Sequence, residues 1–212
     1  MKKTIKITAL FLLLGTIVNA QDNTTDNRNA LQIGVKVGGS YSNVYDTQGQ
    51  DFNADAKLGF TGGAFLAIPI GTYLGVQPEV LVTQKGFKAT GDLLGFPYTF
   101  TRTSTFLDIP IFLALKPSPF LTLLVGPQYS YLMKQKDVFT SSAVSYQQQQ
   151  QFELNNVRKN IFGIAAGLDI NIGIVVLSGR VGWDVQDNNG DGTSSSPRYK
   201  NVSGQIDIGF RL

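Results

Sequence analysis

Charged side chains set at intervals among small and apolar residues are the positions of this sequence that could do chemistry. Glu79 and Asp108 are two such carboxylates, and a close carboxylate pair can act as general acid and general base. The chain contains no His and no Cys, which excludes Ser-His catalysis, thiol chemistry and metal sites built on those ligands. A carboxylate pair also needs access to a substrate, which depends on the elements that carry it.

A second candidate site is the polar segment 187–192. Asp187, Asn189 and Asp191, followed by a glycine, match the first half of a calcium-binding loop. The closing position of such a loop requires a bidentate Glu and is Arg198 here. We therefore expect a polar external turn, with weak calcium binding as the alternative, and we predict no metal or other cofactor.

The N-terminal segment has the pattern of a secretory signal peptide at residues 1–20. A basic start, an apolar run from Ile7 to Leu14 and small residues before Gln21 fit this pattern; an N-terminal anchor helix is the alternative. Residues 21–30 are polar and are predicted to form a flexible periplasmic leader. Without the three lysines of residues 1–20, basic and acidic residues balance at 15 each, so bulk charge favours no nucleic-acid partner.

Residues 31–212 are predicted to form β-strands. In 106–116, aliphatic residues fall at every second position from Leu107 to Leu115, so they share one face of an extended strand. The alternation changes parity near 103–106, which predicts a bulge, and Pro110 predicts an interrupted ladder. Eight strands are expected, at about 31–44, 58–70, 73–88, 106–116, 120–133, 161–172, 174–185 and 202–212.

The faces and connections of these strands indicate a membrane barrel. One face of each strand is mostly apolar, whereas the other is mainly Gly, Ala, Ser, Thr and Gln, with few of the Lys and Glu that cover a soluble protein. A soluble barrel or sandwich is the alternative. Connections alternate long and short, with long ones at about 45–57, 89–103, 134–160 and 186–201. We predict an all-β fold, an eight-stranded antiparallel up-and-down transmembrane β-barrel with both termini periplasmic.

Several charges fall on the face assigned to the barrel interior. Lys36, Arg180 and Asp207 lie near the middle of strands that are adjacent in a closed barrel, so we expect a buried ionic network among them. Glu79 or Asp108 would join it, either as a plug that fills the barrel or as the gate of a narrow pore. Other inward charges lie nearer the strand ends, namely Lys85, Asp169, Asp184 and Arg211. A packed interior gives a carboxylate pair no substrate access, so we predict no enzyme.

Four sequence stretches carry a family resemblance. LGVQPEVLVTQKG (74–86), FLDIPIFLALKP (106–117), LLVGPQYSYLM (123–133) and FGIAAGLDI (162–170) resemble the outer-membrane β-barrel proteins of Bacteroidetes. That family includes PorT-like proteins and is similar to small OmpX/OmpA-type barrels. The end of the chain, Phe210 to Leu212, resembles outer-membrane insertion signals, although its last residue is not aromatic. The resemblance implies an integral protein of the outer membrane, but it implies no particular activity.

The expected function is non-enzymatic, with outer-membrane lipid around the barrel and external loops that present a binding or structural surface. Extended hairpins around 98–102 and 144–154 would offer strand edges to another protein. Two alternatives remain open: a small transport pore and, implied by the PorT-like resemblance alone, an accessory component of a protein secretion machine.

Overall fold

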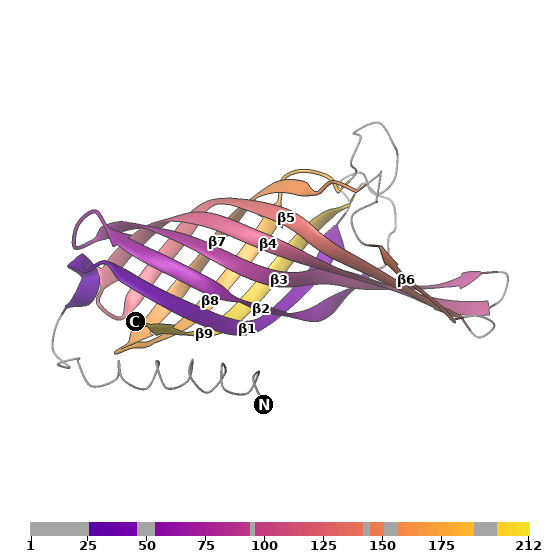
Figure 1. Ribbon diagram of the computed structural model, residues 1–212, viewed down its shortest axis with the longest axis horizontal. Coiled ribbons are helices and arrows are strands. Elements are labelled where there is room, and N and C mark those ends of the chain that lie inside the picture. Colours follow the sequence, from indigo (N-terminus) through magenta and orange to yellow (C-terminus); the bar gives the residue numbers. More distant parts are fainter. Residues whose placement is uncertain (1–25, 46–53, 94–95, 142–144, 151–156, 189–198) are drawn as a thin grey trace, which may run out of the picture.

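Nine strands and one short helix make up the part of the chain that the structure describes (Figure 1). The structure is a computed structural model in which residues 26–45, 54–93, 96–141, 145–150, 157–188 and 199–212 are described. The helix η1 spans Asn27–Asn29. The strands are β1 (Gln32–Tyr45), β2 (Ala54–Pro69), β3 (Leu74–Leu93), β4 (Phe96–Ser118), β5 (Leu121–Ser141), β6 (Ser145–Gln150), β7 (Asn160–Ile172), β8 (Val175–Asp184) and β9 (Lys200–Arg211).

Eight of these strands form a closed antiparallel ring. The hydrogen-bonded order is β4-β3-β2-β1-β9-β8-β7-β5, and β5 pairs again with β4 to close the ring. The first and last strands, β1 and β9, pair along most of their lengths. Each strand of the ring is therefore hydrogen-bonded to a neighbouring strand on both sides, as a β-structure inside a lipid bilayer requires. The predicted eight-stranded antiparallel barrel is confirmed.

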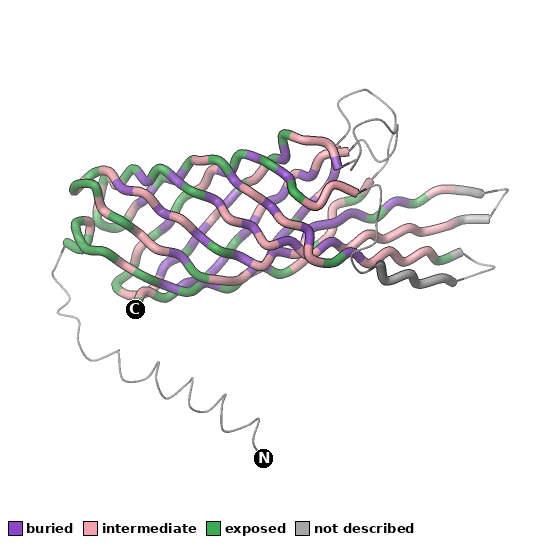
Figure 2. The backbone as a smooth tube through the Cα atoms, turned by 45° about the horizontal axis from the view of Figure 1, so that its top comes forward, coloured by how far each residue is buried: buried purple, intermediate pink, exposed green. Residues whose placement is uncertain are grey.

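Burial alternates along each strand, as Figure 2 shows. Outward positions carry exposed aliphatic side chains such as Leu58 and Ile206, which are 74% and 78% exposed. Inward positions carry polar side chains such as Thr61 and Asp108, both 0% exposed. A polar inside and an apolar outside are the arrangement of a barrel in lipid, not of a soluble one. In the described residues no helix is long and apolar enough to cross a membrane.

The short connections all lie at one end of the barrel, together with the C-terminus (Figure 1). Gly173 makes the turn between β7 and β8 at a φ of +58°, which favours glycine. At the end of β4 the prediction needs correction, because the strand continues through Ser118 rather than turning from residue 116. A register shift between Leu115 and Ser118 accommodates the intervening residues as an irregularity in the β4–β5 pair.

The bulge and the interrupted ladder predicted for β4 both occur at the predicted positions. Its pairing with β5 shifts register between Thr105 and Phe106, which confirms the bulge. On the β3 side, Pro110 has no ladder partner, and the pairing resumes at Ile111 in the same register. A proline has no N–H to donate, so this gap follows directly from its chemistry.

Three strands are longer than predicted. β3, β4 and β5 continue past the barrel to Leu93, Phe96 and Ser141, and β6 pairs with the outer part of β5. The segments 89–103 and 134–160 are therefore not simple loops: each contains strand. The sequence signal is short, because aromatic residues alternate with threonine only around Tyr98 and Phe100, and 147–151 is a run of glutamine. β3, β4, β5 and β6 together form a protruding sheet beyond the barrel (Figure 1).

The described part of the predicted leader contacts the barrel. Asp26 caps η1 by accepting a hydrogen bond from the Arg28 N–H, and Arg28 also lies 5.1 Å from the ring centre of Tyr73. The Lys116 ammonium donates to the Arg28 carbonyl at 2.5 Å. Residues 26–30 thus include a short helix that contacts the barrel. Residues 1–25 lie outside the described part, and the flexible leader at 21–30 stays a prediction.

Candidate functional site

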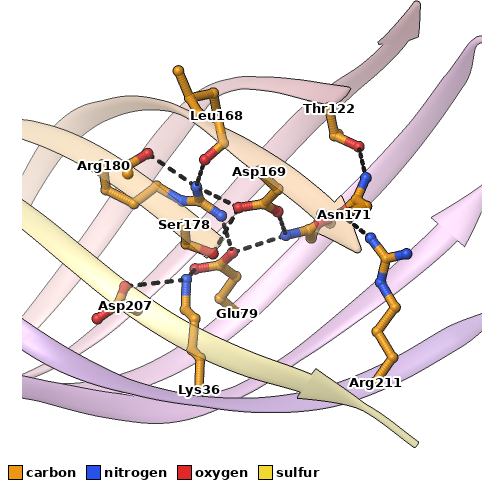
Figure 3. A network of polar contacts seen from close by, with 12 residues as sticks. Lys36, Glu79, Thr122, Leu168, Asp169, Asn171, Ser178, Arg180, Asp207 and Arg211 are labelled. Carbon is orange, nitrogen blue, oxygen red and sulfur yellow. Dashed lines mark hydrogen bonds and ion pairs between the residues drawn. The ribbon is translucent and has the colours of Figure 1, made fainter. Parts of the chain in front are cut away.

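A network of charged side chains crosses the middle of the barrel interior (Figure 3). Strand alternation points one residue inward from each of five strands: Lys36 (β1), Glu79 (β3), Asp169 (β7), Arg180 (β8) and Asp207 (β9). Glu79 joins the two cations, with Oε2 at 2.5 Å from the Lys36 ammonium and Oε1 at 2.9 Å from Arg180 Nη2. Arg180 Nη1 lies 2.8 Å from Asp169 Oδ1. These contacts tie strands from opposite sides of the barrel into one unit.

Neutral side chains complete most of this network. Gln77 Nε2 donates to Glu79 at 2.9 Å and to Asp169 at 3.1 Å, and the Ser178 hydroxyl donates to Asp169 at 2.7 Å. Gly167 leaves the space that Arg180 occupies, since a Cβ there would lie 2.6 Å from Arg180 Cδ. Asp169 thus accepts several hydrogen bonds, and Arg180 donates through Nη1 and Nη2, while its buried Nε has no partner.

Asp207 is the one carboxylate of this network that accepts no hydrogen bond. Its nearest charged partner is the Lys36 ammonium at 3.9 Å, and neither carboxylate oxygen has a hydrogen bond, although the residue is only 1% exposed. The five residues comprise two cations and three carboxylates. Asp207 is thus the carboxylate with the weakest compensation.

Asp108 belongs to a separate group of side chains, nearer the end of the barrel that carries the protruding sheet. The Lys85 ammonium lies 3.1 Å from Asp108 Oδ1, and the Ser130 hydroxyl donates to the same oxygen at 2.6 Å. Lys85 also donates to Ser130 at 3.3 Å and lies 4.9 Å from the ring centre of Phe106. Asp108 shares no contact with Glu79, so the geometry gives no carboxylate pair and no link from Asp108 to the central network.

The central network brings together four of the predicted residues: Lys36, Glu79, Arg180 and Asp207. Asp169 and Lys85 also form buried ion pairs, which their positions near the strand ends did not indicate. Barrel strands tilt, so residues at different depths along neighbouring strands can lie at one level. The alternation of the strands showed that the side chains of Asp169 and Lys85 point inward. It could not identify their ion-pair partners, because that also requires the stagger between neighbouring strands.

A group of aromatic and charged side chains lies at the end of the barrel that carries the protruding sheet. Arg102 makes two bonds to the Asp137 carboxylate, at 2.8 and 2.7 Å, and donates to the Tyr199 hydroxyl at 2.6 Å. Its guanidinium also lies 6.0 Å and 5.4 Å from the ring centres of Phe87 and Phe100. Burial raises the pKa of the Tyr199 phenol, although the neighbouring Arg102 cation opposes that shift. This group fixes the base of the protruding sheet against the start of β9.

The candidate calcium segment is described only in part. Asp187 Oδ1 lies 3.9 Å from the Lys200 ammonium, and Asn189 and Asp191 fall outside the described residues. Within the described residues, no group of three or more acidic side chains could hold a metal ion. The polar external turn, with weak calcium binding as its alternative, stays a prediction.

Comparisons with solved structures find small outer-membrane barrels. Ail of Yersinia pestis is 15% identical, with a TM-score of 0.47 over 85% of this chain and 98% of that chain. OprG of Pseudomonas aeruginosa is 10% identical, with a TM-score of 0.44 over 87% and 97%. Neisserial surface protein A is 11% identical, with a TM-score of 0.43 over 85% and 97%. These likenesses concern the fold alone.

No curated protein matches the sequence. A family model described as "Outer membrane protein beta-barrel domain" matches residues 19–187, which is most of the chain. The match agrees with the closed ring of strands, the apolar exterior and the polar interior. The chain therefore belongs to the outer membrane protein beta-barrel domain family, and it is an integral β-barrel of the outer membrane.

Proposed function

We propose that this barrel is a non-enzymatic scaffold that holds the protruding sheet outside the cell as a binding surface for another protein. The observation that carries the proposal is the edge strand β6. It pairs with β5 on one side, and on its other side it has no strand partner among the described residues. An unpaired edge presents a row of N–H and C=O groups to which an extended segment of a partner can add.

The composition of β6 supports this use of its edge. Natural edge strands are protected by charges, prolines or bulges. The β6 sequence, SYQQQQ, contains no charge and no proline. The edge of β6 therefore lacks the protection that would oppose strand addition.

The filled interior favours a binding scaffold over a pore. Glu79 and Arg180 connect β3 to β8 across the barrel, and the side chains of both are at most 4% exposed. A path for solute would have to break this pair, which costs several kcal/mol in a low-dielectric interior. The barrel then serves as an anchor, with lipid on its outside.

The orientation is part of the proposal. Both described ends of the chain, Asp26 and Leu212, lie at the end with the short connections (Figure 1). In bacterial outer-membrane barrels the short turns are periplasmic and the long connections are extracellular. We assign the described ends to the periplasm and the protruding sheet to the exterior. A PorT-like role in a secretion machine is a narrower form of the same proposal and requires a stoichiometric partner that co-purifies with the barrel.

Proline substitutions in β6 test strand addition. The N–H groups of successive strand residues point to opposite edges. Of Gln148→Pro and Gln149→Pro, one therefore removes a bond to β5 and the other removes a donor from the open edge. The matched controls, Gln148→Ser and Gln149→Ser, shorten the side chain but keep the N–H.

We expect cross-linking of intact cells to give one discrete adduct of the wild-type chain. The serine variants should retain this adduct, and the proline variant at the open edge should lose it. Migration that differs between heated and unheated samples would show that each variant barrel is closed. The proposal fails if the adduct survives in both proline variants, or if a correctly inserted wild-type barrel gives none. Discrete single-channel openings of the purified protein would instead favour a pore.

A further inference from the structure

A small cavity opens at the end of the barrel with the short connections, well away from the protruding sheet. Its volume is about 30 Å³, and its lining comes from η1, β4, β5, β7 and β9 among other elements. A cavity of this kind needs roughly 10–15 Å³ for each water molecule. The space thus suits two waters or one small polyatomic ion.

Three cationic side chains line this cavity: Arg28, Lys116 and Arg211. Arg28 is paired with Asp26, at 2.6 Å. Among the described residues, neither Lys116 nor Arg211 has a carboxylate within ion-pair distance. Two cations without an ion-pair partner at a partly enclosed polar cavity favour a positive potential, which would attract an anion.

The hydrogen bonds of the two cations leave donors unused. The Lys116 ammonium has three donors and makes one described hydrogen bond, to the Arg28 carbonyl. Arg211 donates through Nη2 to Asn171 Oδ1 (Figure 3), and its buried Nε has no partner. A buried donor without an acceptor is costly, and an anionic acceptor would remove that cost.

Gly75 makes room for the Lys116 head group. A Cβ at this position would lie 3.3 Å from both Cε and Nζ of Lys116 and 2.7 Å from the Ile68 carbonyl oxygen. The ammonium therefore lies against bare backbone at the cavity. Because residue 75 has no side chain, the positive charge of Lys116 occupies the space beside it at the cavity.

We propose that this cavity binds a small oxyanion of the phosphate class between Lys116 and Arg211. Lysine binds a phosphate oxygen as a point charge, and arginine offers planar donors to the same group. Two sources of this chemistry meet a periplasmic barrel end: free phosphate, and the phosphate of an inner-leaflet lipid head group. The proposal is independent of strand addition at β6.

Calorimetric titration of the refolded chain with inorganic phosphate, in a non-ionic detergent at constant ionic strength, tests the site. We expect saturable binding of one phosphate per chain. Lys116→Gln and Arg211→Gln should each weaken binding at least tenfold, while Arg211→Lys, which keeps the charge, should restore part of the loss. The control is Lys57→Gln, because the Lys57 ammonium also donates to a backbone carbonyl, that of Leu58 at 3.2 Å, but does not line this cavity.

The same titration in nanodiscs distinguishes the two sources. Weaker apparent phosphate affinity in nanodiscs of zwitterionic phosphatidylcholine than in the phosphate-free, non-ionic detergent would show that a lipid phosphate competes for the site. Equal affinity in both would assign the site to the free anion. The proposal is overturned if the wild-type chain binds no phosphate in detergent or discs. It is also overturned if Lys116→Gln and Arg211→Gln, shown by heat-modifiable migration to be folded, bind as well as Lys57→Gln.

Discussion

Replacing one carboxylate at a time separates hydrogen-bond geometry from charge balance in the central network. Glu79→Gln and Asp207→Asn each remove one of its three carboxylates, so a count of charges predicts the same effect for both. The geometry predicts different effects. Glu79 accepts bonds from Lys36, Arg180 and Gln77 at 2.5, 2.9 and 2.9 Å, whereas Asp207 accepts none.

The expected magnitudes follow from these contacts. Glu79→Gln leaves Lys36 with only Asp207, at 3.9 Å, as a charged partner. Breaking a buried ion pair by removing one partner typically costs about 3–5 kcal/mol, and we expect at least about 3 kcal/mol here. Asp207→Asn removes a buried group that has no hydrogen bond to lose, so we expect a change of less than about 1 kcal/mol. Asp187→Asn is a control for Asp207→Asn, because Asp187 has a 3.9 Å ion pair with Lys200 but is exposed.

The assay is equilibrium unfolding of the refolded barrel in lipid vesicles by guanidinium. Trp183 is the only tryptophan of the chain and lies at an outward position, 43% exposed, so its fluorescence reports its departure from lipid. Loss of heat-modifiable migration provides a second, independent readout. Equal destabilisation by Glu79→Gln and Asp207→Asn would refute the geometric reasoning and show that Lys36 simply moves onto whichever carboxylate remains.

Three further predictions concern the packing around Gly167, the ionisation of Tyr199 and the contacts of Arg102 at the base of the protruding sheet. Gly167→Ala places a Cβ 2.6 Å from Arg180 Cδ and should cost about 1–3 kcal/mol in the same unfolding assay, whereas Gly179→Ala, with nothing within 4 Å, should be close to neutral; equal effects would contradict the packing argument. Because burial raises the Tyr199 pKa, its phenol should ionise above pH 10, and its contribution to stability should be full below that pH and fall as the pH rises further. The absorbance at 295 nm, taken as the difference between the wild type and Tyr199→Phe, measures this ionisation, and a midpoint at or below pH 10 would count against it. Arg102→Lys loses the two-bond pairing with a carboxylate and should accelerate proteolysis of the protruding sheet without opening the barrel; unchanged proteolysis would show that the guanidinium is not needed there.

Alternation with period two was enough to predict the ring and the inward face, because lipid outside and polar packing inside impose opposite demands on neighbouring residues. It placed Lys36, Glu79, Arg180 and Asp207 in the interior correctly. It could not choose between Lys85 and the central cations as the partner of Asp108. That choice depends on strand tilt and on the reach of a lysine side chain, which are properties of the closed barrel.

The protruding sheet was predicted only in part, as extended hairpins around 98–102 and 144–154. Its strands extend beyond the lipid, and the apolar packing there is limited to a few contacts such as Phe87 with Phe100 and Tyr98 with Phe139. Glycine, proline and threonine interrupt the sequence of residues 88–105, so only the alternation around Tyr98 and Phe100 indicated a strand, although 88–93 and 96–101 pair in the ladder of β3 and β4. Hydrogen bonding between strands stabilises it, and a single sequence carries little signal of such long-range pairing.

The pairing of β1 with β9 determines when this protein can acquire its structure. The two strands at opposite ends of the barrel sequence must meet before the ring exists, with Gly34 opposite Arg211 and Tyr45 opposite Lys200. Contacts so distant in sequence form slowly, because a long loop must close first. Until β9 is available, β1 and β8 each present an open edge that can pair with the wrong chain. Ring closure therefore has to wait for β9, the last strand of the ring along the chain.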